Sequence, residues 1–285
     1  MNDHLLSVIL GIVEGLTEFL PVSSTAHLRI SEWLLNISLQ DGYWKMYSVV
    51  IQLGAILALP VYFRARIANF LSTFPKGERG DRTILTHPLS LTIIAFIVTA
   101  GPSFLLTKLI SHNLESLYVM AWALLIGGIV MWVVDASCRN PKINHMEEMG
   151  LGQAIWIGAC QILSAVFPGT SRSMSTIAAG QVAGMSRESA LEFSFFLSMP
   201  TMIVATGYQL LKTLHPKPVP GETIVPIVMD AHNWTVLGIG FVVSFIVALG
   251  VVAWFMHWVR RHGFVPFAIY RILLGAFLLS PFAKF

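Results

Sequence analysis

Residues 14–27 have the sequence EGLTEFLPVSSTAH, in which two acids, a proline, several hydroxyl side chains and a histidine interrupt an apolar stretch. Glu14 and Glu18 are four residues apart, so a helix places both carboxylates on one face. Pro21 ends that helix, and residues 22–25 predict a turn into a second helix. An acid at mid-membrane costs about 2.5–3.5 kcal/mol on insertion scales. We therefore expect these polar groups to serve a function.

The composition around this stretch is that of an integral membrane protein. Of 285 residues, 55% are hydrophobic and 12% are charged, and the mean hydropathy is +0.71. Soluble domains carry about twice that charged fraction. The first ten residues lack the basic region and cleavage site of a removable signal peptide. We attribute the net charge of +3 and the pI near 9.0 to basic cytoplasmic loops, and expect no nucleic-acid partner.

The sequence predicts one membrane domain, 1–285, made of two similar halves at 1–150 and 151–285. Aligned without a gap, GIVEGLTEFLPVSST (11–25) falls on GACQILSAVFPGTSR (158–172), with glycine on glycine and proline on proline. This pattern indicates an internal duplication. The fold class we expect is all-α and polytopic, with one re-entrant helical hairpin and three transmembrane helices in each half.

A re-entrant hairpin is predicted in each half because the first segment of that half is broken by a proline. The helices on either side of the break are too short to cross the membrane. Residues 5–20 would rise about 24 Å as a helix, against about 30 Å for the hydrocarbon core. With a shorter helix at 24–37, they predict a hairpin whose tip is at residues 21–24. The second hairpin is expected at 151–167 and 173–185. The six long apolar candidates for spans are 43–63, 88–110, 117–134, 189–211, 234–259 and 264–282.

The basic residues predict the orientation in the membrane. Each half crosses an odd number of times, so the second half is expected to be inverted. With the N-terminus outside, ten basic residues share one side: Arg64, Arg66, Lys76, Arg79, Arg82, Arg139, Lys142, Arg187, Arg260 and Arg261. Five fall on the other: Lys45, Lys108, Lys212, Lys217 and Lys284. Because positive loops favour the cytoplasm, both termini are predicted to be periplasmic and both hairpin tips to meet near the midplane.

The second tip, PGTSRS at 168–173, supplies groups that bind anions. Its glycine permits a tight turn, Ser171 or a neighbour caps the next helix, and Arg172 offers a planar fork for phosphate oxygens. Both tips start helices, whose N-termini present free N–H groups. The carboxylates of Glu14 and Glu18 would repel a phosphate unless a hard cation bridges them, which predicts Mg²⁺ or Ca²⁺.

Each of these residues also has a structural interpretation. The acids are alternatively partners of a base such as Arg29, and Arg172 is alternatively part of a structural ion pair. The serines of both tips are alternatively caps alone, and His27 an ordinary buried histidine. Arg271, inside the last span, we interpret as a buried ion pair or as a side chain that reaches the membrane surface. The joint occurrence at two repeat-related tips favours a functional site.

Five segments of the chain resemble sequences of the undecaprenyl-diphosphate phosphatase family, also called the bacitracin-resistance protein family. The resemblance covers nearly the whole chain, at 14–27, IQLGAILA (51–58), PGTSRSMSTIAAG (168–180), EFSFFLSMP (192–200) and PFAIYRI (266–272). It implies a bacterial inner-membrane enzyme, dependent on a divalent cation, that removes the terminal phosphate of undecaprenyl diphosphate. The product would be the lipid carrier for peptidoglycan and other envelope polymers. The site is expected to open to the periplasm.

The resemblance places the functional positions of the family on Glu14, Glu18, Ser24, His27 and Arg172, with Ser171, Ser173 and Thr176 beside them. Ser23 and Thr25 flank Ser24 and also carry hydroxyl groups. Both are expected to bind phosphate together with Ser171, Arg172, Ser173 and Thr176. Two positions depart from the family pattern. Ala26 and Met174 stand where the family usually has glycine, which adds bulk beside the predicted site and makes an altered prenyl preference one interpretation.

The sequence leaves two mechanisms and two functions open. In our hypothesis Glu14 and Glu18 hold the cation, and Arg172 stabilises the charge on the transferred phosphoryl group. Ser24 attacks with His27 as the base, or a metal-activated water takes the place of Ser24. The alternative function is a transporter that flips a polyprenyl phosphate, because inverted repeats and broken helices also form secondary carriers. A homodimer is the assembly we consider.

Overall fold

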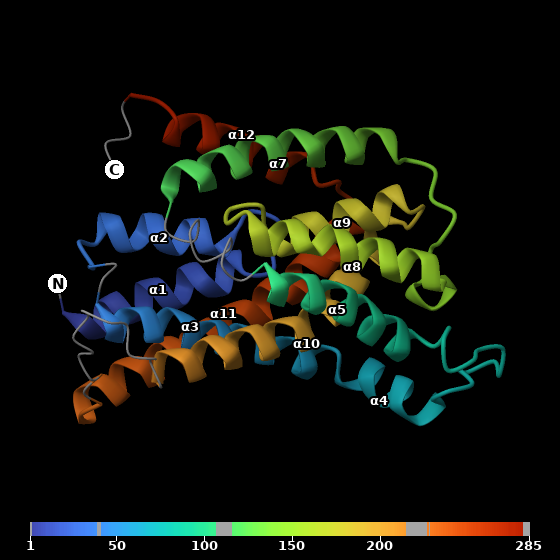
Figure 1. The fold of residues 1–285 in the computed structure, drawn as a ribbon, viewed down its shortest axis with the longest axis horizontal. Coiled ribbons are helices and arrows are strands. Elements are labelled where there is room, and N and C mark those ends of the chain that lie inside the picture. Colours follow the sequence, from blue (N-terminus) through green and yellow to red (C-terminus); the bar gives the residue numbers. More distant parts are fainter. Residues whose placement is uncertain (1, 39–40, 107–115, 215–226, 228, 282–285) are drawn as a thin grey trace.

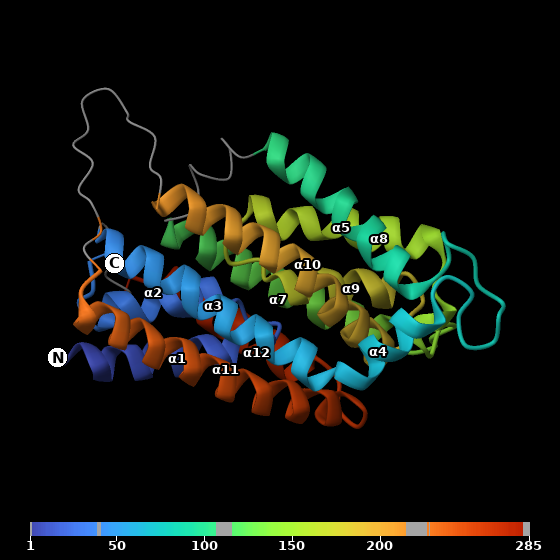
Figure 2. The ribbon, with the colours of Figure 1, turned by 90° about the horizontal axis from the view of Figure 1, so that it is seen from below.

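The computed structural model describes residues 2–38, 41–106, 116–214, 227 and 229–281, and within them the chain is helical with no strand. Figures 1 and 2 show the helices side by side in one bundle. In the described part of the chain, five helices are long and apolar enough to cross a membrane: α3 (Gly42–Tyr62), α5 (Pro88–Leu105), α7 (Leu117–Ser137), α10 (Arg187–Leu214) and α11 (Ala231–Val259). The prediction of a multi-pass, all-α membrane protein is confirmed.

Five of the six predicted spans coincide with these helices to within a few residues. The sixth prediction, 264–282, is too long, because α12 (Val265–Leu278) has 14 residues and would rise about 21 Å. Parts of two predicted spans (107–110 and 282) lie outside the described residues, as do three basic residues used for the orientation: Lys108, Lys217 and Lys284.

A short helix that the sequence did not predict, α4 (Arg64–Thr73), follows α3 directly. The sequence predicts a loop for this basic segment, which follows the predicted span at 43–63. Phe70 is buried, and Arg66 forms ion pairs with Glu192 of α10 and with Glu147 of the 3₁₀ helix η1 (Met146–Glu148). Tertiary contacts therefore stabilise a helix that its own sequence predicts weakly.

Each half begins with two short helices joined by a tight turn. The first pair is α1 (Asp3–Thr17) and α2 (Ser24–Leu34), and the second is α8 (Leu151–Val166) and α9 (Arg172–Val182). In Figure 1, α1 runs from the left towards the centre and α8 from the right, so that the two turns face each other in the middle. Phe19 anchors the first turn, since its ring is fully buried and edge-on to Phe195.

Glycines allow the first helix of each pair to pack closely on a long helix. A Cβ at Gly11 would lie 2.9 Å from the carbonyl oxygen of Gly240 in α11, and one at Gly158 would lie 2.4 Å from that of Ala95 in α5. Figures 1 and 2 show the corresponding pairs, α1 beside α11 and α8 beside α5. Gly11 and Gly158 are aligned in the sequence repeat, so the same close approach occurs in both halves.

Candidate active site

The two turns are in direct contact. The hydroxyl of Ser173 donates a hydrogen bond to the carbonyl oxygen of Leu20 at 3.0 Å. Arg172 Nη2 forms an ion pair with Glu18 Oε1 at 3.1 Å, and the side chains of Arg172 and Glu18 are only 10% and 4% exposed. An acid from the first turn and an arginine from the second therefore occupy one buried site, although 154 positions separate them in the chain.

Two serines cap the helices that leave the turns. Ser23 and Ser171 have φ of 76° and 71°, and each accepts a hydrogen bond from the backbone N–H three residues on. Positive φ is uncommon for residues other than glycine and is often found at functional sites. Both following helices have 11 residues. The two caps are therefore equivalent in structure.

This equivalence corrects the gap-free alignment by one residue. The alignment pairs Ser24 with Ser171, whereas the caps pair Ser23 with Ser171 and hence Ser24 with Arg172. The cause is the length of the turns, because two residues precede the cap after the proline at position 168 and one does after Pro21. The two polar side chains that begin α2 and α9 are thus a hydroxyl and a guanidinium at matching positions.

The hydroxyl of Ser24 donates to Glu18 Oε2 at 2.6 Å. This is a short contact of the kind that a carboxylate makes with a hydroxyl. Glu18 therefore accepts from Ser24 on one oxygen and from Arg172 on the other. Because the carboxylate of Glu18 lies within hydrogen-bond reach of the Ser24 hydroxyl, it is suited to take the proton of that hydroxyl.

His27 makes different contacts from those we predicted for a base beside Ser24. Its Nδ1 lies 2.7 Å from the carbonyl oxygen of Ser23, which can only accept, so Nδ1 carries a proton. Its Nε2 lies 2.6 Å from the hydroxyl of Tyr270, which donates to it when the ring is neutral. The two rings are stacked with 17° between their planes. The structure thus gives Ser24 another acceptor, Glu18.

Glu14 is fully buried, and in the described part of the chain neither of its carboxylate oxygens has a hydrogen-bond partner. It interacts electrostatically with Glu18, Arg172 and Glu32, and when it is protonated it lies within hydrogen-bond reach of the Glu18 carboxylate. The alternative partner, Arg29, instead bonds Glu32 at 2.9 Å. A buried carboxylate without a partner is costly, so it needs either a proton or a cation to neutralise it.

The donor set agrees with a hard cation. Carboxylate and hydroxyl oxygens are what Mg²⁺ and Ca²⁺ bind, and Glu14, Glu18 and Ser24 supply them. Among the described residues there is no group of three or more His, Cys, Asp or Glu side chains arranged for a metal ion. Further ligands would therefore come from phosphate and water, as is usual for Mg²⁺ in phosphoryl-transfer enzymes.

The remaining predicted residues differ in where their side chains point. The hydroxyls of Ser171 and Ser173 lie 3.1 Å apart, at the contact between the turns. Thr176 is buried and bonds the carbonyl oxygen of Arg172 and the hydroxyl of Ser194, so it supports the start of α9. Thr25 is half-buried in the first turn of α2.

The two departures from the family pattern fill the interior. Ala26 is fully buried in a cluster with Met120 and Leu124. Met174 is 4% exposed, and its methyl group approaches Gly127 of α7 so closely that a Cβ there would lie 2.8 Å from it. The added bulk packs between helices.

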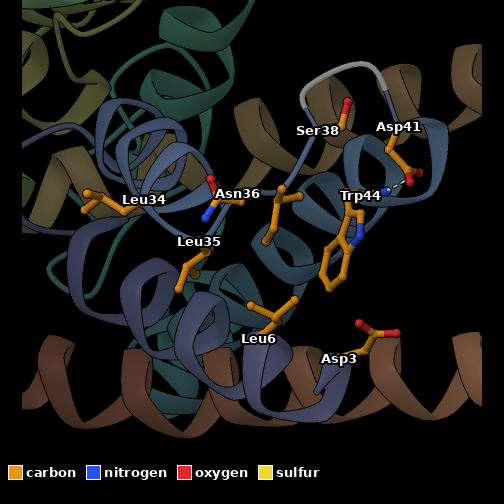
Figure 3. A pocket seen from close by; sticks show the side chains of 9 residues that line it. Asp3, Leu6, Leu34, Leu35, Asn36, Ser38, Asp41 and Trp44 are labelled. Atoms are coloured by element: carbon orange, nitrogen blue, oxygen red, sulfur yellow. Dashed lines mark hydrogen bonds between the residues drawn. The ribbon is translucent and has the colours of Figure 1, made fainter. Parts of the chain in front are cut away.

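A cavity of about 520 Å³ lies at the other end of α1 and is separate from the turns. Figure 3 shows its lining, which includes Asp3 and Leu6 of α1, Asn36 after α2, and Trp44 of α3. Within the described chain, the residues predicted for the site do not line it. This cavity is therefore not part of the site built by the two turns.

Two residues near the site were missed by sequence reasoning. Tyr270 bonds His27, and its neighbour Arg271 donates to carbonyl oxygens of both turns. The available signal was an arginine inside an apolar span, beside a tyrosine in the segment PFAIYRI. That signal marked α12 as unusual without giving the partners of either residue.

Comparison with known proteins gives one consistent result. Residues 7–277 match the family model described as bacitracin resistance protein BacA. The chain is 66% identical to the undecaprenyl-diphosphatase of Koribacter versatilis (strain Ellin345) over 281 residues, which cover 98% of each chain. It is 42% identical to that of Wolinella succinogenes over 278 residues, 96% of each chain. It is 41% identical to that of Caldanaerobacter subterraneus subsp. tengcongensis over 277 residues, 97% of this chain and 95% of the relative.

Proposed function

The chain belongs to the bacitracin resistance protein BacA family, and from this premise we propose that it is an undecaprenyl-diphosphatase. It is an acid anhydride hydrolase that converts undecaprenyl diphosphate to undecaprenyl phosphate and phosphate. The observation that carries this proposal is the bonding of Glu18, which joins the hydroxyl of Ser24 to the guanidinium of Arg172 across two turns. The names of the relatives favour hydrolysis over the transport alternative.

The proposed reaction starts with Ser24. Its Oγ attacks the terminal phosphorus and bonds to it, while Glu18 Oε2 takes the hydroxyl proton and the bond to undecaprenyl phosphate breaks. The oxygen of a water molecule then bonds to the phosphorus and the bond to the serine oxygen breaks; the serine oxygen regains its proton from Glu18, and both protons of the water leave with the phosphate. Arg172 keeps Nη2 on Glu18, and its buried Nε, without a partner among the described residues, is a donor for the phosphate.

We propose a divalent cation, Mg²⁺ or Ca²⁺, held by Glu14 and Glu18. When bound, it would neutralise phosphate charge beside two carboxylates. The support is the unpartnered carboxylate of Glu14. Hydroxyl or N–H groups at the two helix N-termini are proposed to contact phosphate, and they belong to Ser23, Thr25, Ser171 and Ser173. Thr176 is proposed to support them by holding the start of α9.

We further propose that the halves 1–150 and 151–285 form an inverted repeat in one membrane domain, with two re-entrant hairpins. Three observations support it: the opposed directions of α1 and α8, the equivalent caps, and the matching close approaches at Gly11 and Gly158. The proposed setting is the bacterial inner membrane, with periplasmic termini and a site open to the periplasm. The prenyl chain would lie between helices, and a homodimer stays a prediction.

The experiment uses the full chain purified in detergent and a long polyprenyl diphosphate. Phosphate release should require a divalent cation and should fall by roughly 10²–10⁴-fold in Glu18→Gln and in Arg172→Ala. Glu188→Gln is the matched control, because Glu188 forms an exposed ion pair with Arg260. Normal hydrolysis in the first two variants would exclude this site. Absent hydrolysis with lipid movement in sealed vesicles would favour the transporter.

In cells, the product would return to the synthesis of peptidoglycan and other envelope polymers. Because bacitracin resistance is the property in the name of the family, overproduction of this chain should raise resistance to bacitracin. Overproduction of the Glu18→Gln variant should leave resistance unchanged. This comparison tests the proposed activity in the membrane of a living cell.

A further inference from the structure

Arg271 of α12 is fully buried, and no carboxylate in the described part of the chain pairs with it. This corrects our interpretation of Arg271 as an ion pair or as a side chain at the membrane surface. Among the described residues, its guanidinium donates to backbone carbonyl oxygens alone: Pro21 at 3.2 Å, Gly169 at 3.1 Å, Thr170 at 2.9 Å and Ala123 of α7 at 3.0 Å.

Three of these carbonyl groups belong to the two turns. Pro21 lies in the first turn, three residues before Ser24, and Thr170 in the second, two residues before Arg172. Turn carbonyls that are buried inside a membrane protein need donors, because water does not reach them. A guanidinium presents several N–H groups in a fixed plane, so one side chain can satisfy both turns at once.

The space for this guanidinium comes from Gly127 of α7. A Cβ at position 127 would lie 2.4 Å from Arg271 Nη2 and 2.8 Å from the methyl group of Met174. Met174 thus covers the same place from α9. The glycine, the arginine and the methionine come from three helices and fit together around the turn carbonyls.

We propose that Arg271 is a positioning residue that ties the two turns together and thereby sets Ser24 and Arg172 at the distance that one phosphate group spans. The proposal rests on the proposed function. Arg271 acts through the backbone that precedes each of these residues, and it makes no contact with the phosphate in this scheme. Its shape matters in addition to its charge, since a lysine has one nitrogen and cannot reach all four carbonyl groups.

The experiment compares Arg271→Lys and Gly127→Ala with the unaltered full chain in detergent. Gly127→Ala keeps the arginine and displaces the flexible ends of the Arg271 and Met174 side chains, so it serves where Arg271→Lys fails to fold. Gly238→Ala of α11 is the matched control, because a Cβ there meets no heavy atom of the described chain within 4 Å. The double variant Gly127→Ala/Met174→Ala shortens the methionine, so a change that Gly127→Ala causes only by displacing Met174 should disappear. A change that it causes by displacing Arg271 should remain.

Two readouts separate positioning from simple loss of stability. Hydrogen exchange of the peptides that contain residues 19–24 and 168–173 should become faster in both test variants and in the double variant, and stay unchanged in Gly238→Ala. The kcat for phosphate release should fall by about 10²-fold, the scale expected for reacting groups displaced by about 1 Å, while KM changes much less.

The outcomes are decisive in both directions. Unchanged exchange at both turns with unchanged kcat would overturn the proposal. A rise in KM with unchanged exchange would also overturn it, because Arg271 would then contact the substrate. Faster exchange in a chain whose unaltered form releases no phosphate would support the tie between the turns while it rejects the proposed function.

Discussion

The first and second hairpins share a backbone design and carry opposite charges. Both have a serine cap with positive φ and an 11-residue helix behind it. The first places Glu14 and Glu18 before the cap, whereas the aligned positions of the second are Gln161 and Ala165. After the cap, the first begins its helix with Ser24 and the second with Arg172. In the proposed function, the first hairpin supplies the cation ligands and the nucleophile, and the second supplies the anion-binding arginine.

The surroundings of Glu14 and Gln161 explain why the two hairpins differ. The amide nitrogen of Gln161 donates to the hydroxyls of Thr99 and Thr201 at 3.2 and 3.1 Å. The carboxylate of Glu14 has no hydrogen-bond partner in the part of the chain that the structure describes. The amide nitrogen at position 161 thus has partners within the protein, whereas its side-chain oxygen, like the two oxygens of Glu14, has none among the described residues.

The largest expected effect tests Ser24, the residue that matches Arg172 in the other hairpin. Ser24→Ala removes the proposed nucleophile and should reduce the rate of phosphate release by about 10³-fold or more. The measurement is single-turnover hydrolysis with radiolabelled substrate, in which the unaltered chain should transiently carry label on the protein. Near-normal hydrolysis without labelled protein would assign the attack to water.

The second prediction converts Glu14 to the residue of the other hairpin. Glu14→Gln removes a proposed cation ligand, so the concentration of Mg²⁺ or Ca²⁺ for half-maximal activity should rise by about 10-fold or more. Chelation by EDTA should abolish activity in the unaltered chain, and added cation should restore it. An unchanged cation requirement in Glu14→Gln would show that this carboxylate does not hold the metal.

The sequence predicted the parts of this arrangement that depend on local pattern. Five spans followed from hydropathy, and both turns followed from proline and serine in apolar surroundings. The contact of Glu18 with Arg172 could be expected from the repeat. The bond of His27 to Tyr270 and the partners of Arg271 could not, because each of these partners lies more than 100 positions away and is determined by how helices pack. The one-residue difference between the turns was hidden by a gap-free alignment.

A smaller effect is expected from a substitution of Tyr270, the partner of His27. The second hairpin has no histidine that corresponds to His27, so this contact belongs to the first hairpin. Tyr270→Phe keeps the ring and removes the hydroxyl that donates to His27 Nε2, while the bond from Nδ1 to Ser23 remains. The rate should fall by roughly 3- to 10-fold, since Tyr270 orients His27, and His27 in turn holds the backbone of Ser23 beside the proposed nucleophile Ser24. Tyr118→Phe, at an exposed position of α7, is the control. A loss as large as that in Ser24→Ala would give the hydroxyl a direct part in the reaction.

The last prediction reverses the comparison by placing an acid in the second hairpin. The hydroxyl of Thr99 already donates to the carbonyl oxygen of Gly158, and that of Thr201 to Leu197. Both can accept a hydrogen bond from the amide of Gln161, but neither has a proton left for a carboxylate. Gln161→Glu therefore buries an unsatisfied charge, and the apparent melting temperature should fall by about 5 °C or more.

The rate of phosphate release per folded molecule should stay unchanged in Gln161→Glu, because the side chain of Gln161 bonds Thr99 and Thr201, which are not residues of the proposed site. A scan with a thiol-reactive dye in detergent gives the melting temperature, and the assay on the folded fraction gives the rate. A variant as stable as the unaltered chain would mean that a cation or a proton neutralises the new acid. Position 161 would then be as accessible to a neutralising ligand as Glu14, and the surroundings of the two positions would not explain why the two hairpins differ.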